Sequence, residues 1–403
     1  MIKLQLSKEG KLYFRHQALR IILLFFLTYI IICVFISIFP YEIHDSDSSA
    51  YSSIAQKLGH QPIIKWCAPE WWGHGDNVGL FQEHPPGVLW LPALFIRIGV
   101  PGHSAAHCAN FFYIFLSFYF IYLLTSYFGG PILGWGAVFA YTFTPIFLQY
   151  LIRANQELPL NLAVIAGIYG LVRCEESWKY KAIFAVSLVF SFFVKGISAV
   201  ILPILALIYW IIFLRNRRTF LFIILAHLCA LAVMCLFELW YRLVTDGVSF
   251  WQIYTAIQWK YTVVSAFNPF RKIYNFIWYL GRAIWFPAPW VFFVFYGIYK
   301  WRKENIPVLK DKFFKLSVIS ATIIILGFSL FDRKADRYIF PAYSFLVLAG
   351  VWVLFRLKPK IIQFLKKRKK LLPVYLSAIL IIFTLLRIFF HTYFYRFIRL
   401  WPG

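Results

Sequence analysis

The sequence has little charge. Of its 403 residues only 14% are Asp, Glu, Lys or Arg, whereas 61% are hydrophobic and the mean hydropathy is +0.70. A water-soluble domain of this length does not need that much apolar surface. Because a bilayer core takes roughly 20 apolar residues per helix, the chain has room for ten or more membrane-spanning helices and little else. We therefore predict an all-α fold, a polytopic integral membrane helical bundle.

The 6 cysteines show no CxxC motif and no metal-type spacing, and most of them lie inside apolar runs. We infer neither a disulfide framework nor a cysteine metal centre from them. The net charge of +25 does not indicate a nucleic-acid partner either. Such a partner requires basic residues on one water-exposed surface, whereas here they punctuate the apolar runs.

Apolar runs of spanning length predict about eleven transmembrane helices in a single membrane domain, residues 1–403. The first run, Ile21 to Phe39, follows basic residues but has no small-residue cleavage site, so we expect an uncleaved signal anchor. The other runs lie near residues 108–128, 132–150, 158–172, 182–194, 197–214, 220–240, 283–299, 316–331, 338–355 and 371–390. The short run from Pro86 to Val100, which contains Arg97, is predicted to be an interfacial or re-entrant helix.

The placement of charge predicts the orientation. With a cytoplasmic N-terminus, the cytoplasmic segments hold most of the 41 Lys and Arg residues, as the positive-inside rule requires. Two long segments then lie outside: a first external loop, residues 40–107, which we expect to be helical, and residues 241–282, rich in Trp and Tyr. Most acidic residues also fall on the external side, which the rule does not require and which points to function there.

Two polar patches occupy the first external loop. Asp45 and Asp47 follow the first apolar run, and either they cap a helix, since Asp is favoured at helix N-termini, or they serve in chemistry. Glu83 and His84 lie in a stretch that holds most of the 9 histidines of the chain. Such a mixture of His, Asp and Glu either binds a divalent cation, with Glu83 and His84 as candidate ligands, or consists of interfacial polar residues.

Three further patches fall on the same predicted side. Arg153 precedes Glu157, which opens an apolar run where a carboxylate also favours a helix N-terminus. Lys195 lies in a turn between two apolar runs, where it can reach the lipid headgroups. Lys334 and Arg337 belong to a short, cation-rich external loop that goes against the charge rule. An anion such as phosphate, which binds Lys and Arg strongly, would compensate these charges.

The order of these patches resembles the order of motifs in the lipid-dependent glycosyltransferases of the C fold class (GT-C). The resemblance is to the branch of the protein O-mannosyltransferases and the bacterial transferases that add aminoarabinose to lipid A. The matching positions are Asp47, Ser48, Tyr51 and Ala55; Glu83, His84, Pro85 and Pro86; Arg153, Glu157, Pro159 and Leu160; Lys195 and Gly196; and Lys334, Arg337, Tyr338 and Pro341. Ser48 replaces a second acid, His84 a lysine and Glu157 an aspartate of the family pattern. Many relatives carry a soluble C-terminal domain, which we do not expect here.

The resemblance implies a membrane glycosyltransferase of the bacterial inner membrane. It would move a sugar, with inversion, from a polyprenyl-phosphate donor to an acceptor lipid, glycan or protein at the external, periplasmic face. The implied catalytic residues are Asp47 and Glu157. The implied donor-phosphate-binding residues are His84, Lys195, Lys334 and Arg337. The implied substrate-binding residues are Asp45, Tyr51, Glu83, Arg153 and Tyr338. Membrane lipids are further partners, and a divalent cation at Glu83 and His84 is the one cofactor considered.

Other functions stay open from the sequence. A flippase or transporter of a lipid-linked or anionic solute would need polar residues inside the spans, and few are present. An O-antigen ligase or polymerase also uses polyprenyl-linked substrates and external Arg residues, but its large external loop usually lies later in the chain. A purely structural scaffold leaves the external carboxylates unexplained.

Overall fold

The computed structural model describes Ile22 and residues 46–71, 79–142, 144–150, 153–262, 269–304, 311–331 and 334–357. Contacts divide the chain into two units, residues 1–42 with 359–403 and residues 43–358, and the described residues other than Ile22 all belong to the second. Asp45 and the predicted spans near residues 21–39 and 371–390 lie outside the described residues. The prediction of a single domain over residues 1–403 stays a prediction.

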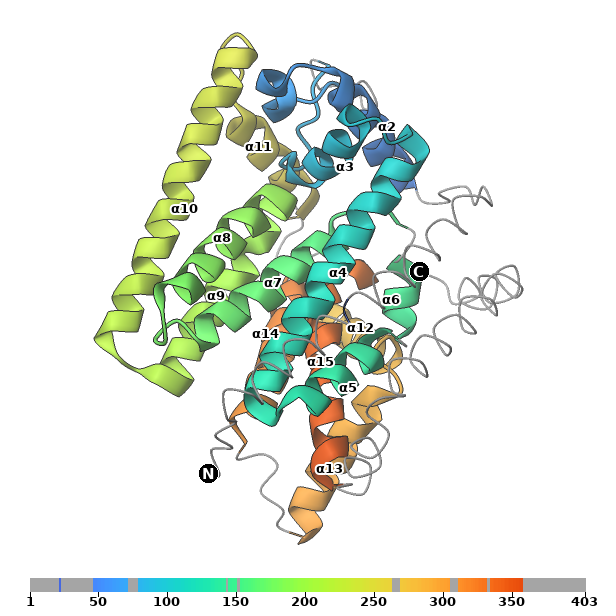
Figure 1. Cartoon of the computed structure of the whole chain (residues 1–403), viewed down its shortest axis with the longest axis vertical. Helices are drawn as coiled ribbons and strands as arrows, with labels where there is room; N and C mark the ends of the chain where they lie inside the picture. Colours follow the sequence, from blue (N-terminus) through green and yellow to red (C-terminus); the bar gives the residue numbers. More distant parts are fainter. Residues whose placement is uncertain are drawn as a thin grey trace, which may run out of the picture. The chain divides into compact units, whose positions relative to one another are not determined.

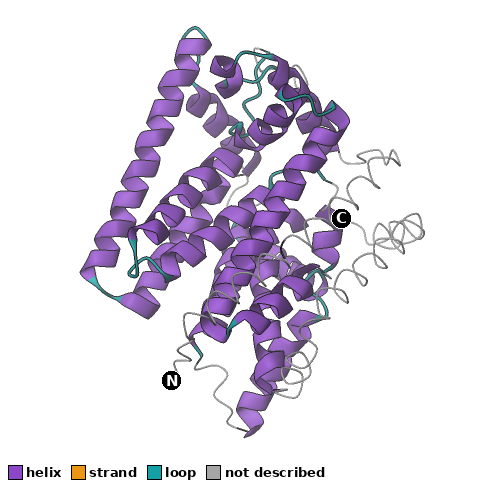
Figure 2. Cartoon of the chain, in the orientation of Figure 1, coloured by secondary structure: helices purple, strands orange, loops and turns teal. Residues whose placement is uncertain are grey.

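The second unit is built from helices, and the described residues contain no strand beyond one isolated bridge, between Glu70 and Leu80 (Figure 2). The elements, with short 3-10 or π turns labelled η, are α2 (Ser46–His60), η1 (Ile63–Cys67), α3 (Gly87–Arg97), α4 (Gly102–Gly129), α5 (Pro131–Thr142), α6 (Pro145–Tyr150), α7 (Glu157–Val172), α8 (Trp178–Lys195), η2 (Gly196–Val200), α9 (Ile201–Tyr209), η3 (Trp210–Leu214), α10 (Arg217–Val244), α11 (Phe250–Thr262), α12 (Pro269–Trp285), α13 (Trp290–Glu304), α14 (Lys312–Ser329), η5 (Asp336–Ile339) and α15 (Phe340–Leu357). The predicted all-α class is confirmed.

Five helical stretches of the described part are long and apolar enough to cross a membrane. They are Ser104–Gly129, Trp178–Leu214, Arg217–Val244, Lys312–Ser329 and Asp336–Leu357. Two shorter apolar helices, α3 and α7, accompany them. The protein is thus an integral membrane protein, while the number of about eleven spans stays a prediction.

Two predicted spans are interrupted in the structure. Residues 132–150 form two helices, α5 and α6, because Pro145 has no N–H to continue the first helix and instead begins the second. Residues 283–299 likewise cross a corner between α12 and α13 that contains Pro287 and Pro289. In both places the apolar composition suited one helix, but proline set its end.

The centre of the unit is α15, which packs against α5, α7, α13 and α14 (Figure 1). A small polar network joins three of these helices inside the core. Asn161 of α7 donates to the hydroxyl of Tyr141 in α5 at 3.2 Å and accepts from Ser344 of α15 at 2.7 Å. Because these polar groups are buried and satisfy one another, they fix how the helices pack at this level.

The helices of the first external loop lie at one end of the unit, together with α11 (Figure 1). α2 packs on α3 through an apolar cluster that includes Ile54, Leu58, Val88 and Leu89. The expectation of a helical first loop is confirmed, and α3 matches the helix predicted between residues 86 and 100. A membrane-interfacial position for α3 stays a prediction.

A sharp turn ends α8 and fixes the position of Lys195. The following residue, Gly196, has φ +55°, a conformation that side chains other than glycine rarely adopt. Tyr254 of α11 packs against this turn, and its hydroxyl accepts a hydrogen bond from the backbone N–H of Ile197 at 2.8 Å. A Cβ at Gly196 would lie 2.1 Å from that hydroxyl oxygen. The turn therefore needs glycine for both its backbone angle and its space.

We expect Gly196→Ala to lower the free energy of unfolding by about 1–3 kcal/mol, because it adds backbone strain and a clash with Tyr254. Thermal unfolding in detergent measures the change. Gly281→Ala in α12 is the matched control, because a Cβ there meets no atom within 4 Å. Equal melting temperatures for both variants would contradict the strain assigned to the turn.

Candidate active site

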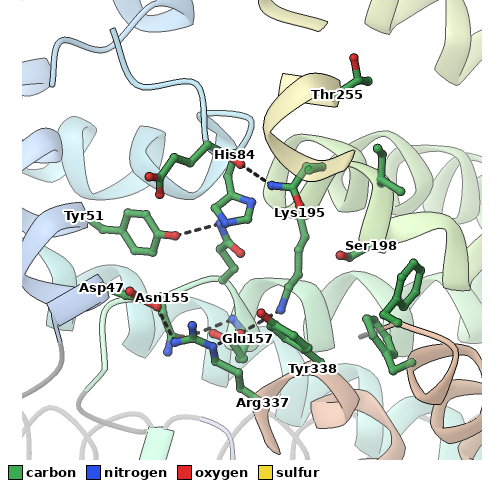
Figure 3. A pocket seen from close by; sticks show the side chains of 16 residues that line it. Asp47, Tyr51, His84, Asn155, Glu157, Lys195, Ser198, Thr255, Arg337 and Tyr338 are labelled. Carbon is green, nitrogen blue, oxygen red and sulfur yellow. Dashed lines mark hydrogen bonds and ion pairs between the residues drawn. The ribbon is translucent and has the colours of Figure 1, made fainter. Parts of the chain in front are cut away.

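A cavity of about 420 Å³ opens among α2, the start of α7, the end of α8, α11 and η5 (Figure 3). Its lining residues are Asp47, Tyr51, Glu83, His84, Asn155, Gln156, Glu157, Lys195, Ile197, Ser198, Thr255, Gln258, Phe328, Phe331, Arg337 and Tyr338. They come from segments that are remote along the chain. The volume falls in the range of small-molecule sites in proteins.

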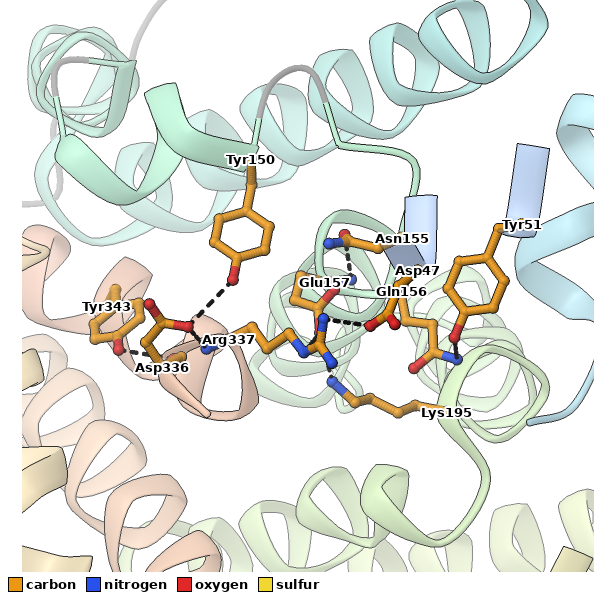
Figure 4. A network of polar contacts seen from close by, with 10 residues as sticks. All are labelled: Asp47, Tyr51, Tyr150, Asn155, Gln156, Glu157, Lys195, Asp336, Arg337 and Tyr343. Carbon is orange, nitrogen blue, oxygen red and sulfur yellow. Dashed lines mark hydrogen bonds and ion pairs between the residues drawn. The ribbon is translucent and has the colours of Figure 1, made fainter. Parts of the chain in front are cut away.

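Two ion pairs form one side of the cavity (Figure 4). Lys195 Nζ lies 2.9 Å from Glu157 Oε1, and both side chains are only 3% exposed. Arg337 lies 2.5 Å from a carboxylate oxygen of Asp47, where the side chains are 21% and 38% exposed. Arg337 Nε also lies 3.9 Å from Glu157 Oε1. Glu157 is therefore flanked by two cations, whereas the ion-pair partner of Asp47 is Arg337.

Both carboxylates stand at helix N-termini. Glu157 is the first residue of α7, and its backbone N–H donates to the side-chain oxygen of Asn155 at 3.3 Å. Asp47 lies in the first turn of α2. The helix dipole favours a negative charge at both places, so local sequence accounts for their positions. The capping and the chemical interpretations of Asp47 are thus compatible, because the same side chain meets Arg337.

The backbone around Arg337 is held by its neighbour Asp336. The Asp336 carboxylate accepts from the backbone N–H of Arg337 at 2.8 Å and from the hydroxyl of Tyr150 at 3.4 Å. Its carbonyl oxygen accepts from the hydroxyl of Tyr343 at 2.8 Å. Asp336 consequently anchors the η5 turn to α6 and α15 and aims Arg337 at the cavity. Its role was not predicted.

Tyr51 closes the cavity on the side of α2. Its hydroxyl accepts a hydrogen bond from the side-chain amide of Gln156 at 3.2 Å. Burial raises the pKa of Tyr51 well above its usual range, and the nearby Asp47 and Glu157 raise it further. Tyr51 therefore stays a neutral phenol at physiological pH and serves as a hydrogen-bonding group, not as a base.

The remaining walls are less charged. Gln258 of α11 donates to the backbone carbonyl of Glu83 at 2.9 Å and so ties the second long external segment to the first. The ring of Tyr338 lies 5.1 Å from Lys195 Nζ, within range of a cation–π contact. Phe328, in the last turn of α14, and Phe331, two residues beyond that helix, give the cavity an apolar side. A ligand with one charged and one apolar part would match this division.

The structure brings most of the predicted site residues together. Those that line the cavity are Asp47, Tyr51, Glu83, His84, Glu157, Lys195, Arg337 and Tyr338. Lys334 and Arg153 do not line it: Lys334 Nζ lies 3.7 Å from the ring centre of Tyr274, and the guanidinium of Arg153 lies over the ring of Tyr150 at 4.9 Å. Lys334 lies two residues before the η5 turn, which contains Arg337. The chemical roles of all these residues stay predictions.

Several lining residues carried no prediction. Asn155 and Gln156 line the cavity and directly precede Glu157. Their position next to a predicted catalytic carboxylate could have identified them from the sequence. Thr255 and Gln258 are three residues apart on α11 and therefore share a helix face, a spacing that the aromatic residues of this segment obscured. Ser198 had no signal in the sequence.

The predicted metal site is undecided. Within the part of the chain that the structure describes, no group of three or more His, Cys, Asp or Glu side chains is arranged to hold a metal ion. Glu83 and His84 both line the cavity, but two ligands do not define a site. A divalent cation at these residues stays a prediction.

Comparison with known proteins supports the fold. A family model described as dolichyl-phosphate-mannose-protein mannosyltransferase matches residues 83–241, less than half of the chain. This segment contains His84, Glu157 and Lys195 but neither Asp47 nor Arg337. No curated protein matches the chain by sequence.

Two solved structures of ArnT from Cupriavidus metallidurans are similar. The form bound to undecaprenyl phosphate has a TM-score of 0.67 at 15% identity, covering 84% of this chain and 61% of that one. The apo form has a TM-score of 0.64 at 15% identity, covering 84% and 60%. The apo oligosaccharyltransferase of Archaeoglobus fulgidus has a TM-score of 0.55 at 12% identity, covering 91% and 54%. The chain spans about three fifths of the ArnT length, and these likenesses confirm the predicted GT-C resemblance and fold.

We expect Lys195→Met to lower the free energy of unfolding by about 3–5 kcal/mol, because it leaves the Glu157 carboxylate buried with its nearest cation removed. Adding Glu157→Gln to that variant should restore most of the loss, since the buried charge is then gone. Thermal and denaturant unfolding in detergent measure both effects. Lys300→Met, in the exposed pair with Glu304, is the control and should leave stability unchanged. A double variant no more stable than Lys195→Met would contradict this account.

Proposed function

We propose that this chain is a membrane glycosyltransferase that moves a sugar from a polyprenyl-phosphate donor to an acceptor hydroxyl at the non-cytoplasmic face of a bacterial inner membrane. One observation carries the proposal. Two carboxylates and two cations, from four remote segments, meet in a cavity that also has an apolar side. The GT-C fold and the undecaprenyl phosphate bound to a structural neighbour support the same class of donor.

The transfer is a single displacement at the anomeric carbon. The acceptor oxygen forms the new bond to this carbon as the bond to the phosphate oxygen breaks, and the electron pair of the broken bond leaves with polyprenyl phosphate. A phosphate is already a good leaving group, so no general acid is required. The acceptor proton goes to a carboxylate acting as general base. Attack opposite the departing phosphate inverts the anomeric centre.

Asp47 fits the base better than Glu157 does. Its side chain is 38% exposed, so an acceptor can reach it, whereas Glu157 is 3% exposed and paired with Lys195. A carboxylate that neutralises a buried lysine cannot take up a proton without leaving that lysine uncompensated. In this proposal Glu157 therefore positions the two cations, and Asp47 accepts the proton.

The cations serve the leaving phosphate. Arg337 presents a planar fork of donors that matches two phosphate oxygens, and Lys195 adds a compact charge on the same side of the cavity. His84 lines the same cavity and is a further candidate contact. Charge that develops on the departing oxygen would be stabilised by these groups, which is the largest contribution that such a site makes to the rate.

The membrane setting suits a lipid-linked donor. Its polyprenyl chain would remain in the lipid, while Phe328 and Phe331 provide an apolar side to the cavity. The acceptor, whether lipid, glycan or protein, would approach from the aqueous side. The predicted orientation puts this cavity on the external, periplasmic side of the membrane.

Incubating the purified protein with a panel of polyprenyl-phosphate sugars, in the presence of membrane extract as acceptor source, tests the proposal directly. Release of polyprenyl phosphate from one or more donors, with the sugar recovered on an acceptor, is the expected result. If donors cross proteoliposomes unchanged and none is cleaved, the chain is a flippase or transporter.

We expect Asp47→Asn to reduce the rate of sugar transfer by about 10²–10⁴-fold, the usual contribution of a general base. The rate of polyprenyl-phosphate release under saturating donor measures the loss. Asp246→Asn is the control: this residue has φ +52°, which Asn also tolerates, and it does not line the cavity. Full activity in Asp47→Asn would show that another group takes the proton.

A further inference from the structure

Arg337 contacts two carboxylates in the structure, those of Asp47 and Glu157. One terminal nitrogen of its guanidinium pairs with Asp47 at 2.5 Å, while Nε lies 3.9 Å from Glu157. If the proposed function holds, a third anion, the donor phosphate, must enter the same cavity. The guanidinium carries five N–H donors, but their fork is rigid and planar. A phosphate that binds two of these N–H donors therefore competes with the Asp47 carboxylate, which already pairs with the guanidinium.

The two existing anions would not lose Arg337 at equal cost. Glu157 is almost fully buried, yet Lys195 Nζ stays 2.9 Å from it, so its charge remains neutralised when Arg337 moves. Within the described residues Asp47 forms no ion pair other than the one with Arg337, but its side chain is 38% exposed and can be rehydrated. A partly exposed carboxylate that loses its partner can be hydrated, so the loss costs less there than at a buried carboxylate. The Arg337–Asp47 ion pair is therefore the one that an incoming phosphate can break at a low cost in free energy.

We propose that the donor phosphate displaces Asp47 from Arg337 and so frees this carboxylate to accept the acceptor's proton. The inference rests on the proposed function and adds an order of binding, with donor before acceptor. In the structure one carboxylate oxygen of Asp47 pairs with Arg337, and in this proposal that oxygen is not available as a base until the pair breaks. When the phosphate takes over the guanidinium, that oxygen is released beside the site where the acceptor must enter.

A different role for Asp47 predicts the opposite change in donor affinity when its charge is removed. If Asp47 served to orient Arg337 toward the phosphate, removing its charge would weaken donor binding. If Asp47 competes with the phosphate, removing its charge strengthens binding, because Arg337 no longer has to leave a partner. The affinity for polyprenyl phosphate itself, which carries the phosphate without the sugar, separates the two cases without any catalytic step.

The test is a double-mutant cycle on the full chain in nanodiscs, with polyprenyl phosphate binding measured by calorimetry. Asp47→Asn should bind about 3- to 30-fold more tightly than the wild type, and the same change in an Arg337→Gln background should have little effect. Glu83→Gln is the matched control, since it removes another carboxylate from the cavity lining. Its effect should be the same with and without Arg337, because the ion pairs of Arg337 in the structure are with Asp47 and Glu157.

Unchanged or weaker binding by Asp47→Asn would overturn the inference, as would equal tightening in both Arg337 backgrounds. Asp47→Ser serves as a second variant that also removes the charge, and melting temperatures confirm that each protein is folded. A wild type that binds no polyprenyl phosphate would instead overturn the proposed function, and the inference with it. The wild type could also bind polyprenyl phosphate and transfer the sugar, while Asp47→Asn has the same effect on affinity with and without Arg337. The proposed function would then stand, and only the order of binding would be wrong.

Discussion

The buried ion pair between Glu157 and Lys195 is the interaction on which the rest of the site depends. It joins the first residue of α7 to the last residue of α8, and neither charge would be stable there alone. Arg337 is the more distant of the two cations beside Glu157, so Lys195 keeps this carboxylate neutralised if Arg337 moves. Arg337 and Asp47 are therefore the charges that the proposed exchange of partners would involve.

The architecture places rigid ends of helices around this pair. Two carboxylates stand at helix N-termini, Gly196 allows the turn that ends α8, and Asp336 ties the η5 turn to α6 and α15. The outer wall comes from α11, which reaches the segment of Glu83 through Gln258. Asp47, Glu157 and Lys195 all lie on helices, which hold their charges more precisely than loops would.

Much of the site followed from reading the sequence. Charge placement and motif order predicted that Asp47, Glu157, Lys195 and Arg337 lie on one face, and the structure puts them around one cavity. The same reasoning grouped Lys334 with Arg337, yet Lys334 contacts the ring of Tyr274 and does not line the cavity, whereas Arg337 does. Sequence spacing gives no direction for side chains in an irregular turn, because the 3.6-residue period holds only inside a regular helix. Proline breaks at residues 145 and 287–289 were visible as well, but apolar composition outweighed them in the prediction of spans.

The sequence by itself determined the helical class, the membrane setting and the residues with chemical potential, because hydrophobic runs and charge asymmetry act locally along the chain. Only the tertiary structure decided which cation meets which anion. The choice of Lys195 for Glu157 and of Arg337 for Asp47 depends on how helices from distant parts of the chain pack, to within a few ångströms. Coulomb energy and burial vary steeply over that distance, and no local pattern encodes it.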